Sequence, residues 1–200
     1  MATEEESTYV KVQGNEVCFH CEVHEDSVIE LVSKMHALVK TLRKAYIDLG
    51  IEEDPAVTLY IKSDGGDLHC GFSAMDHIRN LRARVTTVAD GVCASAATLL
   101  LLAGKNRKML ENSYVLIHQI SADGVWGKFE ELKDHMQNFT KDMDRMQRVY
   151  EAETTIPPRK LKKILKKDLY LDAEQCLRYG LVYDVIKPPS WALEPESDPE

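Results

Sequence analysis

The sequence predicts an α/β domain built on a largely parallel sheet. Short β-branched runs alternate along the chain with longer segments in which apolar residues recur every three or four positions. The helical segments between strands are long enough to cross from one parallel strand to the next. The 200 residues, 44% of them hydrophobic, suit one globular domain with a sizeable core. Strand and crossover helix repeated in this order favour right-handed βαβ units.

The N-terminal part predicts a hairpin followed by a long helix. Residues 9–12 and 16–20 alternate apolar and polar side chains around a Gly-Asn turn, which is typical of two short strands. Residues 27–49 carry apolar side chains at helical spacing, which predicts a long helix. Ser27 and Glu30 have the spacing of a capping box, so we expect this helix to begin at Ser27. Gly50 is expected to end this helix.

The middle of the chain predicts four strands and two helices. The strands are expected over residues 56–62, 85–88, 108–110 and 114–117, where β-branched and apolar residues cluster. A helix that carries Phe72, Met75, Ile78 and Leu81 joins the first two strands. A second helix is expected directly after Ser95, in an apolar stretch that continues to Gly104.

The C-terminal part predicts a long helix, two shorter helices and a last strand. An apolar stripe over residues 129–149 continues for more than six turns, and a helix striped on one side over such a length indicates a partner surface. Helices over 160–167 and 172–180 and a strand over 182–186 follow. We expect a domain over residues 9–186 between acidic, disordered tails at 1–8 and 187–200.

The bulk composition disfavours several classes of protein. A net charge of −8 argues against nucleic acid as a partner, because nucleic-acid binding usually leaves a basic stripe. The longest apolar run, residues 94–103, is far shorter than the ~20 residues of a membrane span, and no leader is visible. Five scattered cysteines indicate reduced thiols. We therefore expect a cytoplasmic protein with no membrane association.

Three polar residues occur in the chain order serine, histidine, aspartate. Ser95 follows a turn of small residues at the mouth of a helix, where unpaired N–H groups can stabilise negative charge. His118 closes the strand expected at 114–117, and Asp168 follows a basic helix. These residue types are the parts of a nucleophilic hydrolase. The pair Gly65-Gly66 after a strand can bring an N–H close to a substrate, although many such turns are simple connections.

The chain also carries several short motifs in a fixed order. They occupy residues 61–66, 91–97, 115–119, 167–174 and 179–182. In this order and spacing the motifs resemble the proteolytic subunit of Clp protease, the ClpP family, over most of the chain from about Glu16 to Ile186. The individual motifs are short, but their common register makes an accidental match improbable.

The resemblance implies a fold and a set of catalytic roles. The fold would be the ClpP/crotonase-like superhelix of stacked βαβ units, with a projecting strand-helix handle at about residues 120–152. Ser95 would be the nucleophile, His118 the general base and Asp168 the residue that orients the imidazole. The backbone N–H groups of Gly66 and Ala96 would form the oxyanion hole.

The same resemblance implies an activity and partners. The protein would be a serine endopeptidase that cleaves unfolded polypeptides inside a homo-oligomeric ring chamber, with two stacked heptamers as the usual assembly. An AAA+ unfoldase would be its partner, and neither a cofactor nor a metal would be required. Asp64 stands where the family usually has proline, which marks this chain as a divergent member.

Other functions and sites are compatible with the sequence. A weakly active or inactive assembly subunit, a viral-type maturation protease and acyl-CoA chemistry on the related crotonase fold remain open. A metal site is disfavoured because the Cys-x-x-Cys pair lacks a second pair; its candidates are Cys18, His20, Cys21 and His24. Cys93 is a second candidate nucleophile, but its apolar neighbours indicate a packed thiol.

Overall fold

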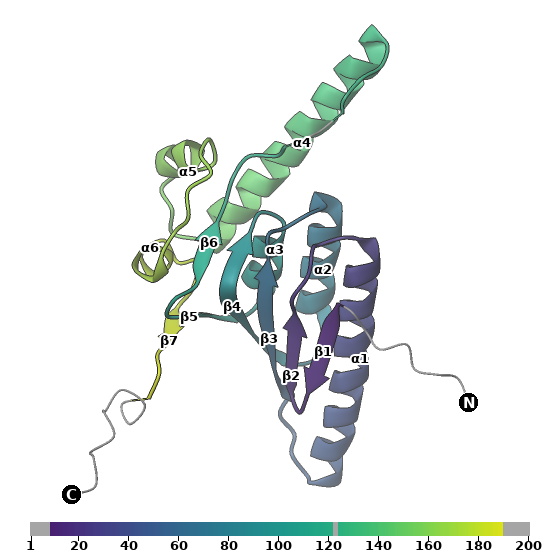
Figure 1. Ribbon diagram of the computed structural model, residues 1–200. Helices are drawn as coiled ribbons and strands as arrows, with labels where there is room; N and C mark the ends of the chain where they lie inside the picture. The colour runs from purple at the N-terminus through teal and green to yellow at the C-terminus, as the bar shows by residue number, and fades with distance from the viewer. Residues whose placement is uncertain (1–8, 122–123, 190–200) are drawn as a thin grey trace, which may run out of the picture.

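The computed structural model describes residues 9–121 and 124–189 (Figure 1). Its strands are β1 (Val10–Gln13), β2 (Glu16–Phe19), β3 (Ala56–Ser63), β4 (Arg84–Ala94), β5 (Asn106–Leu110), β6 (Tyr114–Leu116) and β7 (Asp184–Ile186). Its helices are α1 (Glu25–Asp48), α2 (Leu68–Asn80), α3 (Ala97–Ala103), α4 (Phe129–Glu153), α5 (Pro158–Ile164) and α6 (Ala173–Arg178).

The described strands form one mixed, mostly parallel sheet. The order is β1-β2-β3-β4-β5-β7, with β6 paired to β4 beside this path. The β1–β2 hairpin is antiparallel, and the other strand pairs in the described ranges are parallel. The prediction of an α/β domain with a largely parallel sheet is therefore confirmed. The tail expected at 1–8 lies outside the described residues, as do residues 190–200 of the C-terminal tail.

The long helix α1 begins earlier than its sequence pattern predicts. His24 is the N-cap residue, and the capping box joins His24 to Ser27, which lies at the third helical position. The expectation that Ser27 itself begins the helix is therefore wrong. A histidine ring nitrogen accepts the Ser27 N–H here, and the usual preference for serine or aspartate at an N-cap gives no signal for that arrangement. The C-terminal end is as expected, with Gly50 at φ 71°.

Strand β4 is longer than the expected run at 85–88 and pairs with two strands on one side. Its first half pairs with β5 through Thr86 to Ala89, and its last residues pair with β6 through Val92 to Ala94. The two neighbours follow each other along β4 because β5 and β6 are both short. This arrangement brings the end of β6 beside the end of β4.

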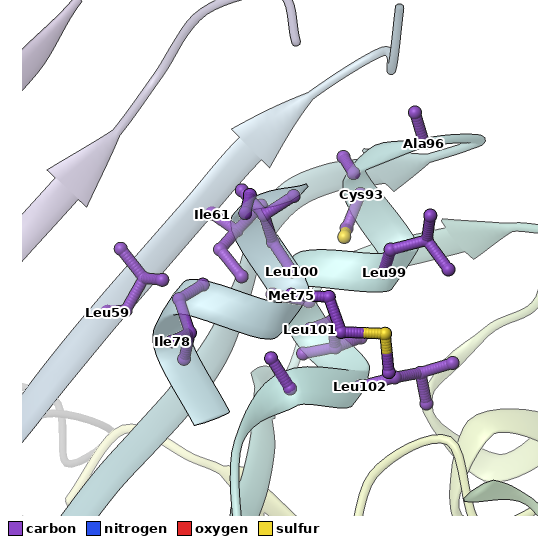
Figure 2. Packing of buried hydrophobic residues seen from close by; sticks show 14 of the residues in the cluster. Leu59, Ile61, Met75, Ile78, Cys93, Ala96, Leu99, Leu100, Leu101 and Leu102 are labelled. Atoms are coloured by element: carbon purple, nitrogen blue, oxygen red, sulfur yellow. The ribbon is translucent and has the colours of Figure 1, made fainter. Parts of the chain in front are cut away.

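The core lies between the sheet and helices α1, α2 and α3, and Figure 2 shows the part of it around α2 and α3. All seven residues of α3 are buried, which explains why its sequence is apolar on every side. Leu59 and Ile61 of β3 and Met75 and Ile78 of α2 belong to the same cluster. A helix this short depends on such packing for its stability.

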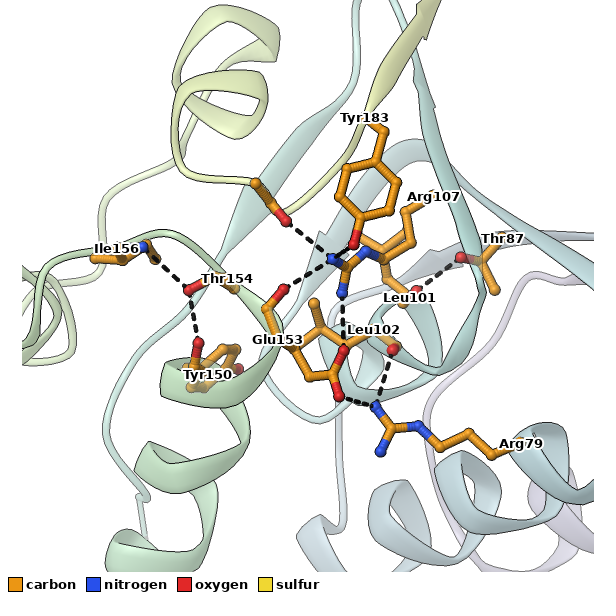
Figure 3. Close-up of polar contacts among 11 residues, drawn as sticks. Arg79, Thr87, Leu101, Leu102, Arg107, Tyr150, Glu153, Thr154, Ile156 and Tyr183 are labelled. Atoms are coloured by element: carbon orange, nitrogen blue, oxygen red, sulfur yellow. Dashed lines mark hydrogen bonds and ion pairs between the residues drawn. The ribbon is translucent and has the colours of Figure 1, made fainter.

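A buried arginine joins the C-terminal segments to this core (Figure 3). Arg107 of β5 is 2% exposed and donates to the backbone oxygens of Glu153 at 2.8 Å and Gly180 at 3.2 Å. It also contacts the Tyr183 hydroxyl and the Glu153 carboxylate, and Arg79 of α2 pairs with that carboxylate at 2.7 Å. Desolvation lowers the pKa of Arg107, while Tyr183 and Glu153 beside it act in the opposite direction.

Helix α4 projects from the sheet, and only its C-terminal half packs on the core (Figure 1). Met146 and Tyr150 are buried, whereas Phe129 and Met136 are largely exposed. The strand expected in the handle is not formed in the described residues that precede α4. A strand needs a hydrogen-bonded neighbour, and the described part of the single chain offers this segment none.

The C-terminal elements are shorter than their patterns predict. Helix α5 ends at Ile164, so that the basic residues up to Lys167 lie in the loop that precedes Asp168. Strand β7 covers Asp184–Ile186 rather than 182–186. No helix in the described ranges combines the length and the apolar character that crossing a membrane requires.

Candidate active site

Ser95 lies at the sharp turn between β4 and α3. Its N–H donates to the Leu116 oxygen at 2.8 Å, so the turn is held against the end of β6. Its φ of 53° is the one left-handed value among the described residues other than glycine. Such a conformation costs free energy and persists only where the surroundings enforce it, which is typical of functional sites. The structure therefore displays Ser95 on a strained turn at the end of a strand.

His118 reaches the same place from the neighbouring strand. Strands β4 and β6 run parallel with Ala94 opposite Leu116, so the residues that follow both strands leave the same edge of the sheet. Ser95 and His118 line one cavity of about 220 Å³. The Ser95 hydroxyl makes no hydrogen bond within the described residues, so the two side chains line one cavity without a hydrogen bond between them.

Asp168 is brought to His118 by a loop that is anchored on both sides. Gln119 donates to the Leu165 oxygen at 2.7 Å, and Leu171 exchanges two backbone hydrogen bonds with Val115 of β6. The Asp168 Oδ1 lies 3.5 Å from the His118 Nδ1, a separation longer than a good hydrogen bond. The His118 side chain is 20% exposed and that of Asp168 is 81% exposed. The carboxylate thus faces the imidazole from the solvent side.

Two backbone N–H groups adjoin the serine. Gly66 and Ala96 both line the cavity, and neither amide donates a hydrogen bond among the described residues. Val23 holds the glycine turn by donating to the Gly65 oxygen and by accepting from the Asp67 N–H, both at 2.7 Å. The Gly66 N–H is left free by this pairing, so two amides are available to a negatively charged oxygen.

Gly65 has to be glycine because the serine turn approaches it closely. A Cβ placed on Gly65 would lie 2.6 Å from the Ser95 Cβ and 2.9 Å from the Ala94 oxygen. Its φ of +106° is also one that other residues rarely adopt. The glycine pair is therefore more than a connection, since it lets two loops from neighbouring strands meet at the site.

The cavity wall contains residues that the sequence gives little reason to single out. Leu99, Phe139 and Met146 give it an apolar surface, and Tyr150 lies among the lining residues. Asp142 of α4 also lines it and faces His69 at 3.4 Å. The one sequence feature that could have identified these α4 residues is their periodicity. Residues 142, 146 and 150 follow each other at four-residue spacing, on the face of α4 that adjoins the core.

The alternative sites have different surroundings. Cys93 is completely buried, and burial raises the pKa of its thiol, which disfavours the nucleophilic thiolate. His24 caps α1, and His20 faces Asp90 at 3.1 Å. Within residues 9–121 and 124–189 no group of three or more His, Cys, Asp or Glu side chains is placed to hold a metal ion.

The arrangement has the parts needed for acyl transfer. A serine and a histidine share a cavity, a carboxylate faces the second imidazole nitrogen, and two amides are free beside the serine. Because the His118 Nδ1 faces Asp168, the Nε2 is the nitrogen left to accept a proton from Ser95. A carbonyl carbon bound next to Ser95 could be attacked with its oxygen near the amides.

Comparison with known proteins finds matches to one family. The family model described as Clp protease matches residues 13–189. The ATP-dependent Clp protease proteolytic subunit of Deinococcus radiodurans is 33% identical over 132 residues, which are 65% of this chain and 64% of that protein. The chain thus spans slightly less than two thirds of that relative. Proteolytic subunit 2 of Treponema denticola is 32% identical over 74% of both chains, and that of Treponema pallidum is 31% identical over 73% of this chain and 74% of that protein.

Proposed function

The chain belongs to the Clp protease family, and we propose that it is a serine endopeptidase that cleaves unfolded or partly folded polypeptides through Ser95, His118 and Asp168. The observation that carries this proposal is the convergence of Ser95 and His118 on one cavity beside two free amides. The proposed function needs no cofactor or metal, because each step is supplied by side chains and backbone N–H groups.

The proposed reaction proceeds in two halves. The His118 Nε2 removes the hydroxyl proton while the Ser95 Oγ attacks the scissile carbonyl carbon, and the negative oxygen is bound by the Gly66 and Ala96 amides. The protonated imidazole then gives its proton to the leaving amine as the C–N bond breaks. Water, which gives a proton to the same imidazole, then attacks the acyl carbon; the bond from that carbon to the Ser95 Oγ breaks, the imidazolium returns the proton to Oγ, and the acid is released. Asp168 stabilises the imidazolium in both halves.

Assembly into rings is part of the proposal. The segment before α4 and its first turns expose large apolar side chains, with Trp126 at 86% and Phe129 at 73%. Exposed apolar surface of this kind is typical of an interaction site. We place these residues in the handle that joins two stacked rings, heptamers as in the usual assembly of the family. We also propose that the protein works in the cytoplasm, with an AAA+ unfoldase as its partner.

The proposal is tested by a fluorophosphonate probe, which phosphonylates an activated serine. We expect one adduct per chain, mapped to Ser95 by peptide mass, and none in heat-denatured protein. Degradation of an unfolded protein should stop as the adduct forms. A folded protein that gives no adduct would contradict the proposal and favour an assembly subunit. Thioester turnover that survives the probe would favour acyl-CoA chemistry.

Replacement of Asp168 by asparagine is expected to lower kcat for a short peptide by about 10- to 100-fold. The loss should be smaller than that expected for a buried triad carboxylate, because Asp168 is exposed and its contact with His118 is long. The KM should change little. Asp172→Asn, which alters a carboxylate that caps α6 four residues away, is the matched control and should keep kcat near the wild-type value. A wild-type kcat in Asp168→Asn would remove Asp168 from the proposed triad.

A further inference from the structure

A buried hydrogen-bond chain links helix α4 to the serine turn. The Thr98 Oγ1 lies 2.5 Å from the Tyr150 hydroxyl and 2.6 Å from the Ser95 carbonyl oxygen. Tyr150 is 1% exposed and Thr98 is fully buried, so water does not compete for these contacts. Tyr150 belongs to the half of α4 that packs on the core, whereas Thr98 is the second residue of α3.

The number of hydroxyl protons determines which group donates in each of these hydrogen bonds. A threonine hydroxyl has one proton, and the Thr98 hydroxyl donates it to the Ser95 oxygen. The Tyr150 hydroxyl must then be the donor to Thr98. Burial raises the pKa of Tyr150, so its hydroxyl keeps the proton that it donates. The order is therefore Tyr150 to Thr98 to Ser95.

The Ser95 oxygen is the other end of the peptide unit that contains the Ala96 N–H. It accepts from the Thr98 N–H at 3.0 Å as well as from the hydroxyl, so it is held by two donors. A trans peptide unit is planar, with its C=O and N–H pointing in opposite directions. Fixing the Ser95 carbonyl toward Thr98 therefore directs the Ala96 N–H the other way. Ala96 lines the cavity, and its amide remains free on that side.

We propose that Thr98 and Tyr150 are positioning residues, which hold the Ser95–Ala96 peptide plane so that the Ala96 N–H points at the oxyanion. This inference rests on the proposed function, because it explains how one N–H donor of the proposed oxyanion hole is held in its orientation. It also gives α4 a direct influence on catalysis. A shift of α4 that separates Tyr150 from Thr98 would loosen the peptide plane.

The test uses variants that remove one hydroxyl each with little change in shape. Tyr150→Phe and Thr98→Val are each expected to lower kcat for a short peptide by about 10-fold, less than the loss of a whole oxyanion-hole donor, with KM within twofold. Thr98→Ser keeps the hydroxyl and should retain most of kcat. The double variant should lose no more than the larger single loss, because both hydroxyls act through one carbonyl.

A peptide aldehyde separates positioning from a general structural effect. Its hemiacetal with Ser95 places an oxygen in the proposed hole, so its affinity should fall by the same factor as kcat. The affinity of the product peptide that carries the newly released amine, which leaves the hole unused, should stay unchanged. Thr41→Val on α1, which removes a hydroxyl that donates to a helix carbonyl, is the matched control. Rates are normalised to the Ser95 sites that a fluorophosphonate titrates.

The outcomes distinguish this inference from the proposed function. Wild-type protein that neither hydrolyses peptides nor labels at Ser95 would overturn the proposed function. An active wild type whose Tyr150→Phe and Thr98→Val variants keep kcat and aldehyde affinity within twofold would overturn only the positioning role. Equal weakening of aldehyde and product peptide would also overturn it, because that result indicates a general change in the cavity.

Discussion

Replacement of Ser95 by alanine is expected to abolish peptide hydrolysis, with a loss in kcat of about 10⁶-fold. The reason is that in the proposed reaction the Oγ of Ser95 forms the acyl bond, and Cys93, the other candidate nucleophile, is completely buried. Removing the hydroxyl leaves the fold intact because that hydroxyl makes no hydrogen bond within the described residues. Degradation of an unfolded protein, followed by gel and mass spectrometry, measures the loss.

Ser73→Ala provides the control for this substitution. Ser73 lies on an exposed position of α2, outside the cavity, so its variant should cleave at the wild-type rate. The mass of the native assembly should be the same for wild type and both variants, which separates loss of chemistry from loss of assembly. Substantial cleavage by Ser95→Ala at the same sites would show that another residue is the nucleophile.

Replacement of Arg107 by methionine is expected to lower the free energy of unfolding by about 3–5 kcal/mol. Methionine keeps much of the side-chain volume but leaves the Glu153 and Gly180 oxygens and the Tyr183 hydroxyl without their donor. Gly180 is buried, so its oxygen loses a hydrogen bond without regaining water. Because Arg107 joins β5 to the end of α4 and to the segment before β7, the loss should affect the whole domain.

Urea denaturation at matched protein concentration measures this effect, since assembly contributes to apparent stability. Arg84→Met is the control: its guanidinium pairs with Glu53 at 3.0 Å, but both side chains are more than half exposed. That variant should change the free energy of unfolding by about 1 kcal/mol or less. A loss below 1 kcal/mol for Arg107→Met would show that the buried network contributes little to stability.

Local patterns in the sequence predict most elements of this fold. The alternation at 9–20, the periodicity of residues 27–49 and the glycine at position 50 depend on neighbouring residues, and the structure places a hairpin and a helix there. Element boundaries are predicted less well. His24 caps α1 through a ring nitrogen, and β4 extends to Ala94 because β6 pairs with its end, which is a contact over more than twenty residues.

Local patterns likewise predict only part of the candidate site, and the rest depends on contacts between distant segments of the chain. The order of the motifs along the chain predicts Ser95, His118 and Asp168 as site residues. In the structure the first two follow the ends of neighbouring strands, and Asp168 lies on an anchored loop beside His118. Tyr150 gives no such signal, because an aromatic residue on a striped helix is most simply a core residue. Its contact with Thr98 depends on how α4 packs against α3, and spacing along the chain does not define that packing.

The most direct test of the central claim is the structure of the assembled protein after reaction with a fluorophosphonate. We predict a bond from phosphorus to the Ser95 Oγ, a phosphonyl oxygen about 2.7–3.1 Å from the N–H groups of Gly66 and Ala96, and the His118 imidazole beside the adduct. An unmodified Ser95, or an adduct whose oxygen points away from both amides with His118 out of reach, would contradict the account.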